Sequence, residues 1–368
     1  MMLADLGADV IKVESPEGDP YRNYQGDHYS PHFQAYNRNK RSIAFDLKLS
    51  AERVVFEGLV QEADVFIQNF RPGTAMRLGA GSERLCAINP RLIYASISGF
   101  GSSGPYADRP SYDSVAQALS GFLSVVVDSS RPRFLGPALA DAITGIYASY
   151  GVLGALVQRG RTGQGNLVEV SMLEAMAHFA VEPFAAFFAL GTTPTSSDRP
   201  RLAQAYILRT ADHRLIAIHL SSLEKFWEGL ISALKAPELD SDVRFSTRQA
   251  RITHYESLNA ELDQRFSRHA LAYWVEQLGR HDVPYAPINT IDEVTHDPQV
   301  EHLGLIVPVE GAHGGTRSVR PPVQFGGIHS GSVRAAPRLN EHGQSIREAL
   351  ARGEKWPAMH ADKELAGA

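Results

Sequence analysis

Short apolar runs alternate with amphipathic stretches through the first half of the chain. The runs are typical of buried strands and lie at 10–13, 42–47, 65–67, 92–97 and 166–170. Helical periodicity occupies 51–62, 82–88, 112–124, 137–158 and 171–190. Repeated strand–loop–helix units predict an α/β domain whose parallel sheet is covered by helices. Such sheets bind ligands beyond the carboxyl ends of their strands.

The pattern changes after 191–201, a segment rich in Thr, Ser and Pro that is typical of a linker. Strand-like runs at 206–209 and 215–219 predict a hairpin, and helical patterns follow near 222–234 and 256–278. We therefore expect a smaller α+β domain after the linker.

Three ranges follow from this division. Residues 1–195 are predicted to form the large domain, 203–285 the small domain, and 286–368 a return segment that completes the large domain. Residues 1–6 resemble the end of a helix closed by Gly7. We therefore expect the first βα unit, about 20 residues, to be missing from this chain.

Asp141 is the only charged residue in the apolar segment 137–157. Pro137 suits a first helical turn, and Asp141 then lies where helix amides and the dipole favour an ionised carboxylate. The segment is long enough to cross a bilayer, but Asp141 and several hydroxyls favour a core helix. Asp141 is thus either a structural residue near a helix cap or a catalytic nucleophile.

Composition narrows the class of protein. The 368 residues are 43% hydrophobic and 21% charged with a formal net charge of −5, typical of a soluble globular protein. That charge gives no reason to expect a nucleic acid or a membrane as partner. The single Cys86 suits a reducing, cytoplasmic compartment. The histidines lack zinc-type spacing, so we expect no metal site.

Three loops carry candidate ligand-binding groups. The string NFRPG at 69–73, with Arg77 one turn later, could bind phosphate through Arg71 and Arg77 and polar edges through Asn69. The basic string NRNKR at 37–41 could face the same ligand, and each loop alone also fits a solvated surface. The string SGFGSSG at 98–104 lacks P-loop spacing and predicts a substrate loop.

Together these strings resemble the class III CoA-transferase family, which includes formyl-CoA transferase, carnitine CoA-transferase and alpha-methylacyl-CoA racemase. The match extends in order over essentially the whole chain. Its main strings are LGADVIKVE (6–14), NRNKRS (37–42), NFRPG (69–73), SGFG (98–101), YD (112–113), AD (140–141), GQG (163–165) and APRLNEH (336–342).

The resemblance implies a Rossmann-like large domain and a small domain in an interlocked homodimer. It implies that CoA or an acyl-CoA binds as substrate, with no tightly bound cofactor. The family's nucleophilic aspartate falls on Asp141, and Tyr112 matches a position beside the acyl site. Its adenosine and phosphate contacts fall on Asn69, Phe70 and Arg77.

Two departures from the family pattern matter. Ser15 stands where the family often has a CoA-binding arginine, so phosphate binding is expected to shift to Arg38, Arg71 or Lys40. Racemases of the family carry histidine where this chain has Tyr112, and a tyrosine is a poor proton shuttle at neutral pH.

The sequence therefore predicts a CoA-transferase that moves CoA from an acyl-CoA to a small carboxylic acid through Asp141. Backbone amides near Gly99 and Gly101 are expected to stabilise the oxyanion. The alternatives are racemase-type α-proton chemistry and a CoA-binding protein without catalytic activity.

Overall fold

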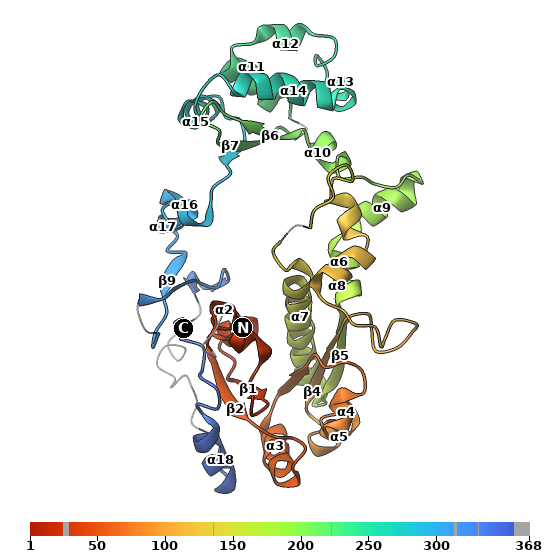
Figure 1. The fold of residues 1–368 in the computed structure, drawn as a ribbon, viewed down its shortest axis with the longest axis vertical. Coiled ribbons are helices and arrows are strands. Elements are labelled where there is room, and N and C mark those ends of the chain that lie inside the picture. The colour runs from red at the N-terminus through yellow and green to blue at the C-terminus, as the bar shows by residue number, and fades with distance from the viewer. Residues whose placement is uncertain (25–28, 135, 222, 313–314, 330, 357–368) are drawn as a thin grey trace. The chain divides into compact units, whose positions relative to one another are not determined.

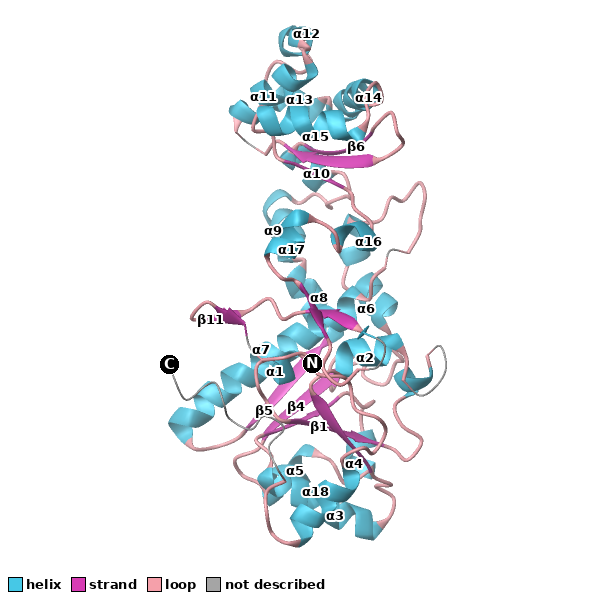
Figure 2. Ribbon diagram, turned by 90° about the vertical axis from the view of Figure 1, so that its left-hand side faces the viewer, coloured by secondary structure: helices cyan, strands magenta, loops and turns pink. Residues whose placement is uncertain are grey.

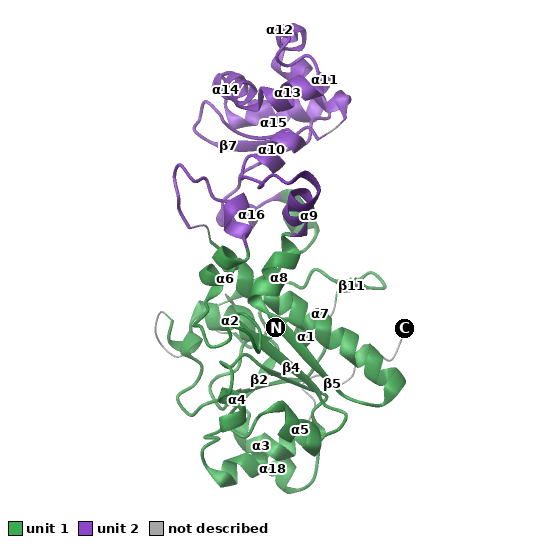
Figure 3. Ribbon diagram, turned by 90° about the vertical axis from the view of Figure 1, so that its right-hand side faces the viewer, with its two compact units in different colours: residues 1–120, 136–180, 298–368 green, residues 121–135, 181–297 purple. Residues whose placement is uncertain are grey.

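The computed structural model describes residues 1–24, 29–134, 136–221, 223–312, 315–329 and 331–356. The chain forms two compact units, shown in Figure 3. Unit 1 comprises 1–120, 136–180 and 298–368, and unit 2 comprises 121–135 and 181–297. The structure thus divides the chain after 180 and 297, whereas the sequence analysis placed the divisions near 195–203 and 285–286.

Unit 1 is built around parallel strands, marked in Figure 2. One pair joins β1 (Val10–Glu14) to β2 (Lys40–Ala44). A second sheet has the order β3 (Val65–Gln68), β4 (Ile93–Ser98), β5 (Asn166–Ser171). The predicted parallel strands are therefore present, divided between two small sheets. Four short strands complete the unit, namely β9 (Ile306–Pro308), β10 (Arg317–Val319), β11 (Gln324–Phe325) and β12 (Ile328–His329).

The helices of unit 1 connect and cover these strands (Figure 1). They are α1 (Met2–Asp5), η1 (Pro20–Asn23), α2 (Pro31–Asn37), α3 (Ser50–Glu62), α4 (Thr74–Arg77), α5 (Ser82–Ile88), α6 (Asp113–Leu119), α7 (Leu139–Thr162), α8 (Met172–Phe179), α17 (Pro298–His302) and α18 (Gly343–Ala351). Phe56, Leu85 and Tyr94 lie at the centre of one buried core. Helix α18 packs on α3 and β2, which brings the C-terminal segment back to the first strands.

Helix α7 packs against β4, β5, α6 and α8. By length and composition it could also cross a membrane, as could the bent pair of α8 with the following helix. The predicted core helix is buried on one side only in the single chain, because a stripe of apolar side chains at spacings of four and three residues is exposed. The stripe consists of Ile146, Tyr150, Leu153 and Val157.

Unit 2 combines an antiparallel sheet with helices, as the hairpin pattern predicted. Its strands are β6 (Ala205–Arg209), β7 (Leu215–His219) and β8 (Tyr285–Pro287), in the order β6-β7-β8. Its helices are η2 (Phe122–Val125), α9 (Val181–Leu190), α10 (Asp198–Ala203), α11 (Glu224–Leu234), α12 (Pro237–Ser241), α13 (Arg248–Thr253), α14 (Tyr255–Phe266), α15 (Leu271–Arg280) and α16 (Ile291–Val294). Trp227, Phe245 and Trp274 lie in its core.

Candidate active site

The carboxyl ends of β3, β4 and β5 share one edge of their sheet. The parallel register places Gln68 opposite Ser96 and Ser98 opposite Ser171. The loops at 69–73 and 99–112 therefore leave the sheet at the same edge, where parallel sheets bind their ligands.

The side chains of the first loop face solvent. Asn69, Phe70, Arg71 and Arg77 are all exposed. The loop is held from within, because the Phe70 amide donates to Gln68 Oε1 at 2.7 Å. Arg77 Nη2 donates to Thr74 Oγ1 at 2.8 Å, so its guanidinium is oriented while the residue stays exposed. This loop can therefore offer cationic and amide groups to a ligand.

Two of the three basic residues in the 37–41 string, Arg38 and Lys40, have different environments. Arg38 is buried, and its Nε and Nη2 donate to Asp5 at 3.1 and 2.7 Å. Its Nη1 donates to Ser318 Oγ at 2.9 Å. Since its guanidinium is committed to the protein, we remove Arg38 from the expected CoA contacts. Lys40 is partly exposed, and burial followed by the charge of Lys12 lowers the pKa of Lys40 to about 8.

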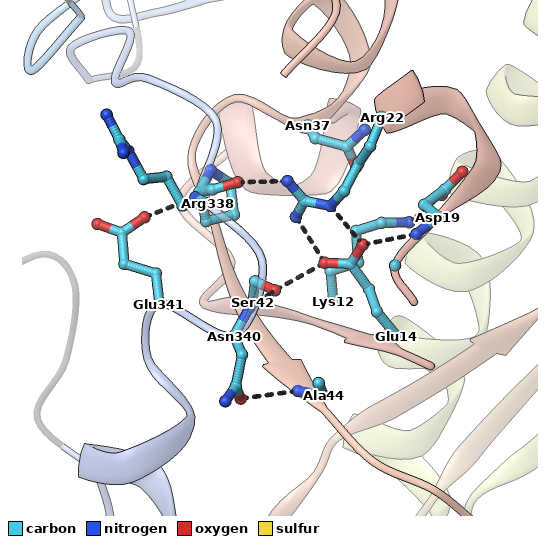
Figure 4. A network of polar contacts seen from close by, with 12 residues as sticks. Lys12, Glu14, Asp19, Arg22, Asn37, Ser42, Ala44, Arg338, Asn340 and Glu341 are labelled. Carbon is cyan, nitrogen blue, oxygen red and sulfur yellow. Dashed lines mark hydrogen bonds and ion pairs between the residues drawn. The ribbon is translucent and has the colours of Figure 1, made fainter. Parts of the chain in front are cut away.

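A buried network fixes the loop after β1, as Figure 4 shows. Glu14 accepts from Arg22 Nε and Nη2, both at 2.7 Å, and from Ser42 Oγ at 2.6 Å. Burial opposes ionisation of Glu14, but the hydrogen bonds from Arg22 and Ser42 outweigh it and lower its pKa. Arg22 also donates to the Pro337 carbonyl at 3.1 Å, which joins the loop to the C-terminal segment.

The same network sets the position of Tyr21. Asp19 accepts from Lys12 Nζ at 2.5 Å and from the Tyr21 amide at 2.9 Å. Burial, followed by the charge of Asp141, raises the pKa of the Tyr21 hydroxyl. Tyr21 therefore lies within electrostatic reach of Asp141, although sequence analysis did not select it.

The side chain of Asp113, the first residue of α6, lies at the start of α7. Its Oδ1 accepts from the backbone amides of Ala140 at 2.7 Å and Asp141 at 3.2 Å. Its Oδ2 accepts from Nε2 of the buried Gln117 at 2.7 Å. A helix start presents unpaired amides that need acceptors, and here Asp113 of α6 supplies one. The expectation that these amides serve the Asp141 carboxylate itself is therefore wrong.

Asp141 lies in the first turn of α7 and its side chain is exposed in the single chain. Protein atoms around its carboxyl group nevertheless displace water, and this partial burial, followed by the negative charge of Asp113, raises its pKa. A raised pKa makes the ionised carboxylate a stronger base and nucleophile than an ordinary aspartate.

The loop at 99–112 is closely packed at its base. A Cβ at Gly99 would lie 2.3 Å from Ser111 Cβ, so only glycine fits there. Gly101 has φ +104° and its amide donates to Ser98 Oγ at 3.0 Å, so that amide already has an acceptor within the loop. Tyr112 precedes α6 and is 74% exposed.

Asp113 and Tyr21 were missed because each acts through a contact distant in sequence. The position of Asp113 in a first helical turn, directly after Tyr112, was the available signal. Within the described residues no group of three or more His, Cys, Asp or Glu side chains could hold a metal ion.

Comparison with known proteins agrees with this architecture. A family model described as CoA-transferase family III matches residues 1–343. The acetyl-CoA:oxalate CoA-transferase of Acetobacter aceti is 34% identical, covering 96% of this chain and 91% of that enzyme. The succinate–glutarate CoA-transferase of Agrobacterium fabrum is 34% identical, covering 93% and 88%.

A solved structure has the same fold. The crystal structure of a CAIB/BAIF family protein from Brucella suis superimposes with a TM-score of 0.85 and 35% identity, covering 95% of this chain and 93% of that one. The α/β architecture with parallel strands is therefore shared along almost the entire length. This chain belongs to CoA-transferase family III.

Proposed function

We propose that this protein transfers CoA from an acyl-CoA to a carboxylic acid, with Asp141 as the covalent nucleophile. The observation that carries the proposal is the division of roles between two neighbouring carboxylates. Asp113 satisfies the amides of α7, and Asp141 keeps a raised pKa. Similar proteins named as CoA-transferases support the reaction class.

The reaction proceeds through two covalent forms of Asp141. A carboxylate oxygen attacks the thioester carbonyl, the C–S bond breaks, and CoA leaves as thiolate. The thiolate then attacks the aspartyl carbonyl of the mixed anhydride, which releases the donor acid and leaves an aspartyl-CoA thioester. The acceptor carboxylate attacks that thioester, the C–S bond breaks, and CoA thiolate and a second mixed anhydride form. The thiolate then attacks the acceptor carbonyl of this anhydride, which gives the new acyl-CoA and frees the Asp141 carboxylate. Covalent catalysis divides one difficult exchange into these steps.

The other predicted residues are given roles that their positions allow. Asn69, Phe70, Arg71 and Arg77 are exposed at the carboxyl edge of the sheet and would contact the nucleotide part of CoA. Lys40 would add a further positive charge. Tyr112 and the backbone at Gly99 border the start of α6, which carries Asp113, and would line the acyl site.

We propose an interlocked homodimer, as the family resemblance implies. The exposed apolar stripe on α7 is a candidate for part of its interface. We propose that the dimer works in the cytoplasm.

Intact-mass measurement after mixing with a panel of acyl-CoAs tests the mechanism. We expect a CoA-sized adduct that maps to Asp141 and is absent from the Asp141→Ala variant. Asp282→Asn serves as the control, because it removes the charge of a surface ion pair with Lys225 in unit 2 and asparagine tolerates the positive φ of this position. Transfer that survives in Asp141→Ala would refute the mechanism. Bound CoA without an adduct, together with solvent deuterium at the α-carbon, would favour racemase-type chemistry instead.

A further inference from the structure

Arg109 is held in place by aromatic rings. Its guanidinium carbon lies 4.6 Å from the ring centroid of Tyr106 and 5.8 Å from that of Phe100. The two rings meet edge to face, with centroids 6.2 Å apart. Such contacts orient a planar cation while leaving its N–H edge available.

The backbone around this platform is also organised. The Arg109 amide donates to the Tyr106 carbonyl at 3.0 Å, and the Ala107 amide donates to the Gly104 carbonyl at 3.2 Å. Successive turns therefore define the course of the loop. Among the ion pairs found in the described part of the chain, none involves Arg109. Its charge is thus oriented and exposed without a carboxylate partner there.

The length of the loop limits how far Arg109 can lie from Asp113. Arg109 precedes Asp113 by four residues, and four residues span at most about 14 Å between Cα atoms. Asp113 in turn contacts the amide of Asp141. An arginine side chain and a short acyl chain together can bridge such a separation.

We infer that Arg109 binds the free carboxylate of a dicarboxylic acid whose other carboxyl group is joined to CoA. The planar guanidinium matches a carboxylate in a bidentate pair. This assigns short-chain dicarboxylates as the substrate class and rests on the function proposed above.

A phosphate of CoA offers the same oxyanion chemistry. The position of Arg109 favours the carboxylate, because it lies on the loop that leads to Asp113 and Asp141. Arg71 and Arg77, by contrast, lie on the loop after β3. The substrate carboxylate and the CoA phosphate can be distinguished by experiment, since loss of a phosphate contact would lower the reaction rate equally with every acyl-CoA.

The test uses the first half-reaction of the whole protein. The rate constant for formation of the Asp141 adduct is measured with three length-matched donor pairs: malonyl- and propionyl-CoA, succinyl- and butyryl-CoA, glutaryl- and valeryl-CoA. For at least one pair we expect the wild type to favour the dicarboxylate by roughly 10- to 150-fold, the worth of a hydrogen-bonded charge pair. Arg109→Gln should remove that preference and leave the monocarboxylate rate within about twofold.

Two further variants separate recognition from folding. Arg161→Gln is the matched control, because this exposed arginine lies about 30 Å along α7 from Asp141 and should keep the preference. Tyr106→Leu removes half of the platform and should reduce the preference partially, because Arg109 keeps its charge but loses its orientation.

Each outcome decides the inference. If Arg109→Gln lowers the rate constant of adduct formation equally for both donors of a pair, Arg109 contacts CoA or supports the folding of the loop, and the inference is overturned. A wild type that forms the adduct without any dicarboxylate preference would overturn it while the proposed function stands. Absence of an adduct with all six donors would overturn this inference, and the proposed function would fall with it if a wider panel of acyl-CoAs also gave no adduct.

Discussion

Replacement of Asp113 tests whether this residue caps α7 and sets the charge state of Asp141. In Asp113→Ala, the amides of Ala140 and Asp141 lose their shared acceptor. A lost N-cap costs about 1 kcal/mol, and a desolvated amide left unpaired costs about 1–3 kcal/mol. Because Ala140 is buried, we expect a total of about 2 kcal/mol in unit 1.

Thermal unfolding followed by circular dichroism measures that loss. For a unit of this size each kcal/mol lowers Tm by about 2–4 °C, so we expect a decrease of about 4–8 °C. Asp113→Asn keeps a carbonyl oxygen as acceptor, so its stability should fall much less. An Asp113→Ala protein that unfolds at the wild-type temperature would refute the capping role.

The pH dependence of adduct formation tests separately whether the charge of Asp113 raises the pKa of Asp141. Partial burial and the charge of Asp113 raise the pKa of Asp141, so removing that charge must lower it. The ionised nucleophile then persists to lower pH, and adduct formation in Asp113→Asn should reach its plateau at a lower pH than in the wild type. Thr247→Ala removes a cap from α13 in unit 2 and should leave this profile unchanged. If Asp113→Asn and the wild type have the same pH profile of adduct formation, the electrostatic coupling between Asp113 and Asp141 is refuted.

Two packing features give further predictions. Gly99→Ala should abolish turnover, because the new Cβ would lie 2.3 Å from Ser111 Cβ. Ser111→Gly in the same chain should restore part of the turnover. Failure of this rescue in a steady-state assay would contradict the packing argument. Arg22→Met should lower the free energy of unfolding by about 3–5 kcal/mol, because it leaves the Glu14 carboxylate buried without its partner. Urea denaturation measures this change, and Arg22→Met with Glu14→Gln should be less destabilised than Arg22→Met alone.

Local patterns were sufficient to predict β1 to β5 and the longer helices between them in their order, because each strand–loop–helix unit is specified by its own periodicity. They were insufficient for helix ends. The expected helix at 171–190 breaks at Ala180 into α8 and α9, and that at 112–124 ends before Gly121, whose φ is +82°. The helix predicted at 51–62 already begins at Ser50, and Leu49 holds its N-cap position.

The candidate site shows the same division between local and distant information. Asp141 was identifiable because a lone charge in an apolar helix is a local anomaly. The burial of Arg38 was not, because its partners Asp5 and Ser318 lie 33 and 280 residues away in sequence. The cap from Asp113 to α7 likewise joins residues 27 and 28 positions apart. Contacts between residues distant in sequence therefore decide which of several basic or acidic side chains remains available to bind or react.

The pairing of Asp113 with Asp141 has a consequence for how a nucleophile can lie at a helix start. An acidic side chain in the first turn ordinarily bonds the nearby free amides, and those bonds stabilise its charge and lower its pKa. Asp141 would do this if the amides had no other acceptor, and it would then be a weaker nucleophile. Because Asp113 takes the amides of Ala140 and Asp141, the Asp141 carboxylate is left available to react. On this argument Asp113→Ala should slow adduct formation even at a pH where Asp141 is fully ionised, since Asp141 would turn toward the vacant amides.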